Sequence, residues 1–253
     1  MIKISVVIIT FNEETNIERC LLSVKDIADE IVVLDSFSTD KTEDICKKYS
    51  VTFLQHEFDG HIEQKNRVIT HTKNNFVLSL DADEVLSKEL INSIIEVKNN
   101  PKYDAYFFNR QNFFCENKIK HGGWYPDKKI RLWNKYKGKW GGINPHDTVI
   151  LNDNTTKKYI KGDLLHYSFT SVNQHIAQIN KFSNIKAEQD LLKDRKSSIL
   201  KIIFNPFIKF VILYFLKLGF LDGYYGFIIA INSSHFTFLR YVKLKELNKT
   251  NKK

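Results

Sequence analysis

Two aspartates in the first third of the chain are placed for metal chemistry. Asp81 and Asp83 stand two residues apart, directly after the apolar run 76–80. Oxygen ligands suit Mg²⁺ and Mn²⁺, and Mg²⁺ usually joins one or two carboxylates to the phosphates of a substrate. The pair therefore predicts a divalent-metal site, and a solvated acidic turn that caps the next helix is the alternative.

Further polar residues follow two other apolar runs. Thr10, Asn12 and Glu13 come after run 3–9, and Asp35 ends run 31–34. No G-x-x-x-x-G-K-[ST] loop and no G-x-G-x-x-G motif follows the first run, which argues against P-loop hydrolases and Rossmann dehydrogenases. A nucleotidyltransferase is disfavoured as well, because such enzymes usually carry a Gly-rich basic signature there. A bound nucleotide is therefore expected to be held by side chains and metal.

The elements that position these residues form a regular alternation. Short apolar runs with strand character lie at 3–9, 31–34, 51–54, 76–80 and 103–108, and helical patterns lie at 15–24, 41–49, 61–71 and 87–98. Such alternation predicts an α/β fold with a largely parallel sheet flanked by helices. Ligands of these sheets bind beyond the carboxyl ends of the strands, where the polar clusters fall.

The charge distribution singles out the end of the chain. The 253 residues include 38 Lys and Arg against 29 Asp and Glu, a formal net charge of +9. Basic residues are concentrated after residue 193, among many Ile, Leu, Phe and Tyr. This mixture favours amphipathic helices on an anionic membrane surface over nucleic-acid binding. A helical cap on the core and a membrane-spanning helix are the alternatives, although Lys201, Lys209 and Lys217 interrupt the apolar stretch.

Cysteine usage and the N-terminus indicate the compartment. The three cysteines are odd in number and none has C-x-x-C spacing, which favours a reducing environment. The first apolar run has one Lys, no small-residue cleavage site and acidic residues directly after it, so it is predicted to be a core strand and not a signal peptide. We therefore expect a cytoplasmic protein, peripheral on the inner face of the cytoplasmic membrane.

Four ordered motifs resemble those of the family 2 glycosyltransferases, which have the GT-A fold. They are VVIITFNEE, IVVLDSFSTDKT, QKN and VLSLDADE, all within residues 3–100. Later segments, GGWYPD with RLW, NPHD, LLHYS and FLDGYYGF, resemble the lipopolysaccharide-core glucosyltransferase branch. The resemblance implies a nucleotide-sugar half at 1–110, an acceptor and catalytic half at 111–198, and a basic helical extension at 199–253.

The resemblance also implies roles for single residues. Thr10, Asn12 and Glu13 match the motif that lines the nucleotide pocket, and Asp35 matches the carboxylate that contacts the base or ribose. Asp81 resembles the ribose-side or metal-side aspartate, and Asp83 the ligand of a Mg²⁺ or Mn²⁺ ion on the diphosphate. Lys65 and Arg67 fall where the family places basic or polar contacts to the donor, and a solvated helix face is the alternative. His166 is a further metal or diphosphate ligand or a packed structural residue.

The reaction implied is direct displacement with inversion, in which one carboxylate takes the proton of the acceptor hydroxyl. Asp147, in the segment NPHD, is the first candidate for this base, and Asp127 is the second. Loop carboxylates that pair with neighbouring cations are the alternative for both. Arg131 is a candidate phosphate contact, and Trp124 and Trp140 either stack on a sugar or pack in the core.

The expected substrates follow from the same branch. The donor is a nucleotide sugar, with UDP-glucose as the first choice and UDP-galactose and UDP-N-acetylhexosamines behind it. The acceptor is a saccharide of lipopolysaccharide or lipooligosaccharide core or another lipid-linked saccharide. A non-catalytic membrane-surface or nucleic-acid-binding protein is the competing interpretation, which the basic tail permits.

Overall fold

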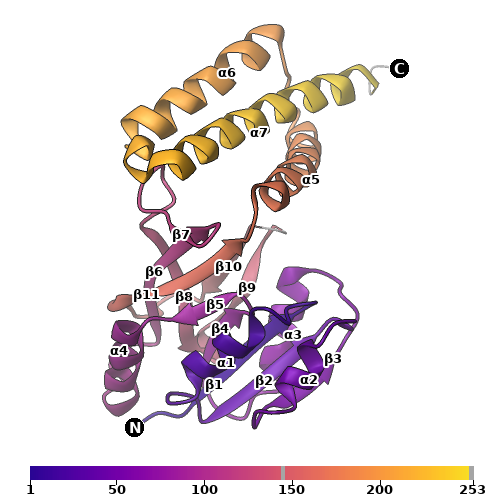
Figure 1. Cartoon of the computed structure of the whole chain (residues 1–253). Helices are drawn as coiled ribbons and strands as arrows, with labels where there is room; N and C mark the ends of the chain where they lie inside the picture. Colours follow the sequence, from indigo (N-terminus) through magenta and orange to yellow (C-terminus); the bar gives the residue numbers. More distant parts are fainter. Residues whose placement is uncertain (144–145, 251–253) are drawn as a thin grey trace. The chain divides into compact units, whose positions relative to one another are not determined.

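A computed structural model describes residues 1–143 and 146–250 of the chain and divides it into two compact units (Figure 1). Unit 1 consists of Met1–Arg110 and Asp127–His166, and unit 2 of Gln111–Pro126 and the chain from Tyr167 onward. The chain leaves unit 1 near residue 110 but returns to it, because a later strand joins the same sheet. The division by packing therefore differs from the functional division expected at 110 and 198, which stays a prediction.

Four parallel strands form one side of the main sheet in unit 1. They are β1 (Ile4–Thr10), β2 (Glu30–Asp35), β3 (Thr52–Gln55) and β4 (Phe76–Asp81), in the order β3-β2-β1-β4. Every residue of β1 except Ile9 is buried, as expected for a strand that is covered on both faces. This part of the sheet confirms the parallel βα arrangement that the sequence predicts.

The rest of the sheet is mixed. Beyond β4 follow β8 (Asp127–Asn134), β6 (Ala105–Phe114), β11 (Lys157–Phe169) and β5 (Glu84–Leu86), and β7 (Asn117–Lys118) pairs with β6. The pairs β4–β8, β8–β6 and β11–β5 are antiparallel. The run 103–108, expected to extend the parallel array, belongs to β6 in this antiparallel half. A separate antiparallel ribbon joins β9 (Gly138–Ile143) to β10 (His146–Leu151).

Helices cover both faces of this sheet. On one face, α1 (Ile17–Val24) and α4 (Lys88–Asn99) pack against alternate residues of β1 in the largest core cluster, and α2 (Thr42–Cys46) lies beside α1. On the other face, α3 (His61–Thr70) packs against β1, β2 and the ribbon strand β9. Ser87 caps α4 by accepting a hydrogen bond from the Leu90 amide. The helices therefore hold the strand ends in a fixed relation.

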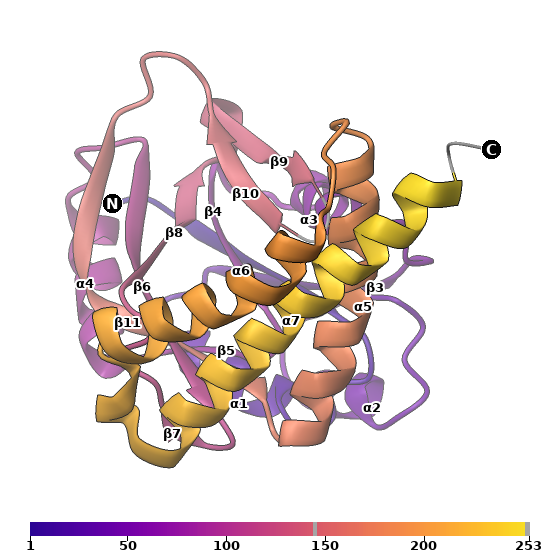
Figure 2. The ribbon, with the colours of Figure 1, turned by 90° about the horizontal axis from the view of Figure 1, so that it is seen from above.

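Unit 2 is mostly helical. It contains α5 (Val172–Leu191), α6 (Ile199–Val211), the π-helical turn η2 (Ile212–Leu216), the 3₁₀ turn η3 (Gly219–Asp222) and α7 (Gly223–Thr250). The long helix α7 runs beside α6 and packs against α5 (Figure 2). Phe114 and Ile229 form the centre of its core, with the rings of Trp124 and Phe169 around them. Trp124 is thus part of an aromatic core here.

Candidate functional site

The register of the parallel strands brings three polar strand ends together. Thr10 at the end of β1 lies opposite Asp35 at the end of β2, and Ile9 lies opposite Asp81 at the end of β4. Thr10 and Asp35 are buried, and within the described part of the chain the Thr10 hydroxyl has no hydrogen-bond partner. A buried hydroxyl without a partner is uncommon and is suited to a ligand atom.

The loop after β1 is tied to the loop after β2. The Asn12 amide oxygen accepts a hydrogen bond from the Thr39 backbone N–H at 2.8 Å, and the Asn12 N–H donates to the Ser38 hydroxyl at 2.8 Å. Asn12 has a φ of 54°, in the left-handed region that Asn tolerates better than most residues. Asp35 holds the second loop by accepting from the Ser38 N–H at 2.8 Å. Both residues therefore shape the loops around the strand ends.

Glu13 has an unusual electrostatic environment. Its N–H donates to the Thr42 hydroxyl, and its side chain accepts a hydrogen bond from the Asn16 amide at 2.5 Å. Burial raises the pKa of Glu13 to about 7, with help from the negative charge of Asp83, while the Asn16 hydrogen bond acts in the opposite direction. Burial and the neighbouring carboxylate of Asp83 thus both favour the neutral form of Glu13.

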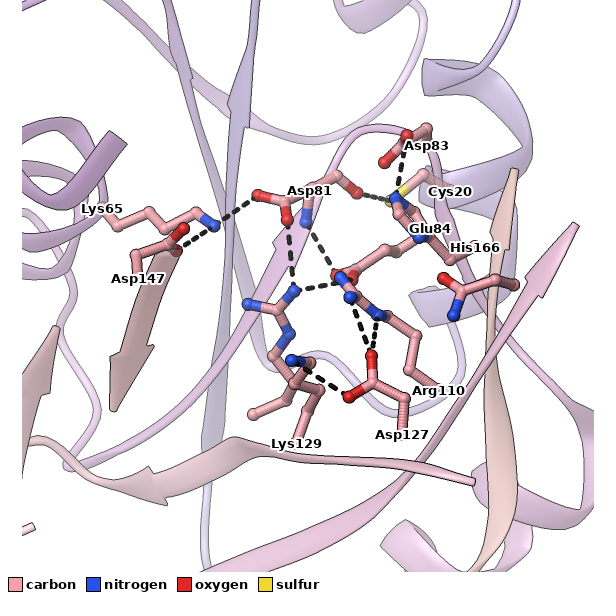
Figure 3. Close-up of polar contacts among 12 residues, drawn as sticks. Cys20, Lys65, Asp81, Asp83, Glu84, Arg110, Asp127, Lys129, Asp147 and His166 are labelled. Carbon is pink, nitrogen blue, oxygen red and sulfur yellow. Dashed lines mark hydrogen bonds and ion pairs between the residues drawn. The ribbon is translucent and has the colours of Figure 1, made fainter. Parts of the chain in front are cut away.

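Lys65 links two of the candidate carboxylates (Figure 3). Its ammonium lies 2.8 Å from Asp81 Oδ1 and 2.8 Å from Asp147 Oδ2, and only 4% of its side chain is exposed. Helix α3 supplies Lys65 and β10 supplies Asp147, so the ribbon that packs on α3 delivers Asp147 to the end of β4. The buried Lys65 thus forms ion pairs with both Asp81 and Asp147.

Arg131 on β8 holds Asp81 from the other side. Its Nη2 lies 3.1 Å from Asp81 Oδ2 and 2.6 Å from Glu84 Oε1, and both Arg131 and Glu84 are buried. Burial opposes ionisation of Asp81, but the charges of Lys65 and Arg131 outweigh it and keep the pKa of Asp81 well below the ordinary value. Asp81 is therefore an ionised, doubly paired carboxylate at neutral pH.

Asp127 has two cationic partners of its own. Arg110 contacts its Oδ2 atom at 2.8 Å, and Lys129 contacts its Oδ1 atom at 3.1 Å. Both oxygens of Asp127 are therefore engaged, whereas the pair of Asp147 with Lys65 uses Oδ2. Asp127 is therefore more fully paired than Asp147 in the ion pairs that the structure describes.

Asp83 has a different kind of partner. The Nε2 atom of His166 lies 3.2 Å from Asp83 Oδ2, because the β11–β5 ladder sets His166 opposite Glu84, the residue after Asp83. No Lys or Arg pairs with Asp83 among the residues that the structure describes. The same part of the chain holds no group of three or more His, Cys, Asp or Glu arranged for a metal. A metal on Asp83 would thus need further ligands from a substrate or water.

Arg67 and Trp140, candidates for a donor contact and for sugar stacking, already have partners within the protein. Arg67 forms a two-pronged ion pair with Asp59, at 2.9 and 2.6 Å, on the exposed side of α3. Trp140 is buried, with Lys65 and Arg131 against its ring. Trp140 therefore packs as a core residue beneath the charged cluster, and its face is already occupied.

Sequence reasoning assigned no role to Glu84 and Arg110, although both belong to the charged cluster. Glu84 follows Asp83 directly, and its carboxylate accepts a hydrogen bond from the Asp81 N–H at 3.0 Å. Arg110 reaches the cluster from β6, at 3.6 Å from Glu84. The four carboxylates of the cluster face four cations, so it is close to neutral, while Asp83 and Glu13 lie outside these pairs. The carboxylates are Asp81, Glu84, Asp127 and Asp147, and the cations are Lys65, Arg110, Lys129 and Arg131.

Comparison with known proteins identifies the class to which this fold and site belong. The family model described as glycosyl transferase family 2 matches residues 5–155. An uncharacterized glycosyltransferase of Rickettsia bellii is 35% identical over 97% of this chain and 87% of its own length. The chain therefore belongs to glycosyl transferase family 2, and it is a glycosyltransferase with a GT-A fold.

Two further comparisons are with a curated relative and with a solved structure. The lipopolysaccharide core biosynthesis glycosyltransferase LpsC of Rhizobium meliloti is 26% identical over 95% of this chain and 91% of its own length. The crystal structure of S. aureus TarS 1–349 covers 98% of this chain and 92% of its own, at 15% identity and a TM-score of 0.45. The chain is thus similar, along nearly its whole length, to a glycosyltransferase described as acting in lipopolysaccharide core biosynthesis.

Proposed function

We propose that this glycosyltransferase moves a hexose from a UDP-sugar, with UDP-glucose as first choice, to a lipopolysaccharide-core or other lipid-linked saccharide. The transfer is proposed to invert the anomeric carbon and to take place at the inner face of the cytoplasmic membrane. The observation that carries the proposal is the meeting of Thr10, Asp35 and Asp81 at adjacent strand ends, with Asp83 directly beyond. The similarity to LpsC supports the acceptor class.

The residues around Asp83 fit a divalent cation. Asp83 lacks a Lys or Arg partner in the described ranges, and its charge helps to raise the pKa of Glu13. Asp83 would hold Mg²⁺ or Mn²⁺, with His166 as a second candidate ligand and phosphate oxygens completing the shell. When bound, such an ion neutralises negative charge on a departing diphosphate. Asp81 is already neutralised by two cations, so it is better suited to a ribose hydroxyl or to orienting Lys65.

The chain's own residues supply the remaining chemistry. The hydroxyl oxygen of the acceptor forms the new bond to the anomeric carbon, while the bond from that carbon to the diphosphate breaks and the nucleoside diphosphate leaves. Asp147 takes the hydroxyl proton on its carboxylate, and the ion pair with Lys65 holds that carboxylate in place. Thr10 and Asp35 are proposed to bind the nucleoside, with Asn12 and Glu13 shaping the same pocket.

Thermal unfolding with UDP, GDP, CMP and dTDP, each with and without Mn²⁺, tests the proposal. A nucleotide bound only by the folded chain at 100 times its dissociation constant adds about 2.7 kcal/mol, which is easily detected. We expect a Mn²⁺-dependent shift with UDP that is lost in Asp83→Asn and kept in Asp153→Asn, an exposed turn residue. A shift with another nucleotide would mean that the donor carries that nucleotide and not UDP. The absence of a shift with all four nucleotides would favour a non-catalytic membrane-surface protein.

A further inference from the structure

Helix α6 presents an apolar face to solvent. Its exposed large side chains recur at the spacing of one helix face, and Leu200 and Phe207 are 66% and 67% exposed. Lys201 and Lys209 lie off this face. The face consists of Ile199, Leu200, Ile203, Phe204, Phe207 and Ile208, and η2 adds the exposed Phe215 and Leu216. A continuous patch of this kind marks an interaction surface.

Another side of α6 packs against α7 within unit 2. Phe210 of α6 meets Phe227 of α7 edge-on and stacks with Tyr214 of η2, and Leu213 of η2 is buried. The exposed side is therefore the face that the fold of unit 2 leaves without a partner. Ile199–Leu216 is also the one stretch, within residues 1–143 and 146–250, long and apolar enough to cross a membrane by length and composition.

The charges around α6 point to an anionic partner. From residue 193 to the end, the sequence has twelve Lys or Arg and three Asp or Glu. Lys201 and Lys209 lie on α6, and Lys217 directly follows η2. Anionic lipid headgroups attract basic segments that lie beside apolar ones. Apolar and basic groups together match the headgroup region of a bilayer.

We propose that the exposed face of α6, continued by η2, lies flat in the headgroup region of a bilayer rich in anionic phospholipid. This inference names the surface that the proposed membrane location would use, and it rests on that part of the proposed function. Lys209 argues against a spanning helix, because it stands near the middle of Ile199–Leu216, where an ammonium is costly. In an interfacial helix, Lys201 flanks the apolar face and reaches the headgroups, whereas Lys209 lies on the side of α6 turned away from them.

The bilayer would also fix a loop of unit 2. Asp222 at the end of η3 accepts hydrogen bonds from the N–H of His121 at 2.7 Å and from its ring Nδ1 at 2.9 Å. The Gly122 N–H donates to the carbonyl of Lys217, directly after η2, at 2.9 Å. These contacts tie the HGGWYP segment to the turn that follows α6. Seating α6 on lipid therefore sets the position of this segment relative to the membrane surface.

Vesicle co-sedimentation of the full chain tests the inference. The vesicles are phosphatidylcholine alone and phosphatidylcholine mixed with phosphatidylglycerol, and the variant is Phe204→Asp with Phe207→Asp. Tyr136→Asp is the matched control, because Tyr136 is equally exposed at 67% but lies in unit 1. We expect binding to the anionic vesicles, a loss of at least about tenfold in the double variant, and little change in the control.

Three outcomes would overturn the inference. They are equal vesicle binding by the double variant, binding that resists alkaline carbonate and ignores lipid charge as a spanning helix would, and a dimer dispersed by the double substitution without any vesicle binding. The UDP-dependent thermal shift is measured on the same samples. A retained shift without vesicle binding rejects the membrane face alone, whereas vesicle binding without any nucleotide shift rejects the proposed transferase chemistry alone.

Discussion

The ammonium nitrogen of Lys65 lies 2.8 Å from Asp147 Oδ2, although 82 positions separate the two residues in the chain. The same nitrogen lies 2.8 Å from Asp81 Oδ1 at the end of β4. One buried cation thus joins the carboxylate at a strand end to the carboxylate proposed as general base. The contact therefore fixes the distance between the proposed base and the end of β4, beside the place proposed for the donor.

Lys65→Met is expected to lower kcat/KM by roughly tenfold to a hundredfold. The variant removes the cation that joins Asp147 to Asp81, and a proposed base that is no longer held in place acts less well on the acceptor hydroxyl. The measurement is kcat/KM for release of the nucleoside diphosphate, with Lys48→Met on the exposed end of the α2 region as control. An unchanged kcat/KM would mean that the contact between Lys65 and Asp147 is not needed for catalysis.

Arg131 and Glu84 are expected to be strongly coupled in stability. Their side chains are 4% and 0% exposed and 2.6 Å apart. Arg131→Met leaves the buried Glu84 with the Asp81 N–H and the more distant Arg110, and removing one partner of a buried pair costs roughly 3–5 kcal/mol. Urea unfolding should show that adding Glu84→Gln to Arg131→Met recovers much of this loss. Strict additivity of the two single changes would mean that the pair is not coupled.

The parallel half of the fold could be predicted from the sequence, and the other half could not. Run 3–9 is apolar throughout and β1 is buried on both faces, so the pattern and the structure agree. The 13-residue strand β11 gives no such signal, because KKYIKGDLLHYSF has polar residues scattered along it and only two of its residues are buried. Its pairing with β6 and β5 depends on contacts distant in the sequence.

The candidate site also has one part that could be predicted from the sequence and one part that could not. Thr10, Asp35 and Asp81 follow apolar runs, and parallel pairing necessarily brings such strand ends together. The ion pairs of Lys65 with Asp147 and of Arg110 with Asp127 join separate elements, so no local spacing records them. Basic residues before β4 were recognised from the family motif, but which carboxylate Lys65 reaches depends on where the β9–β10 ribbon packs.

Glu13→Gln is expected to stabilise the protein at pH 8 and to have little effect at pH 4.5. The folded state raises the pKa of Glu13 from 4.5 to about 7, so the folded chain binds more protons than the unfolded chain in this interval. Stability is therefore lost as the pH rises from 4.5 to 7. Allowing for partial exposure, about 1 kcal/mol or roughly 2–4 °C in Tm is expected at pH 8. An equal shift at both pH values would contradict this account.

The stability contributed by His175 is expected to fall as the pH falls, whereas that contributed by Glu13 falls as the pH rises. It is 7% exposed, and its ring Nδ1 lies 2.9 Å from the Asn232 amide nitrogen. Burial lowers the pKa of His175 from 6.5 to about 4, so the unfolded chain binds more protons between these values. The stability that neutral His175 allows is complete above pH 6.5 and is lost as the pH falls toward 4.

The loss can be measured as the change in the free energy of unfolding between pH 7 and pH 4.5. His175→Gln removes the titrating ring and can keep a hydrogen bond to Asn232, so its stability should fall less steeply with acid, by about 2 kcal/mol over this interval. His71→Gln, on the exposed end of α3, is the control and should follow the wild type. If His175→Gln and the wild type lose stability in parallel, protonation of His175 is not coupled to unfolding. Glu13 and His175 lie in different units, so the two pH effects should be additive in a double variant.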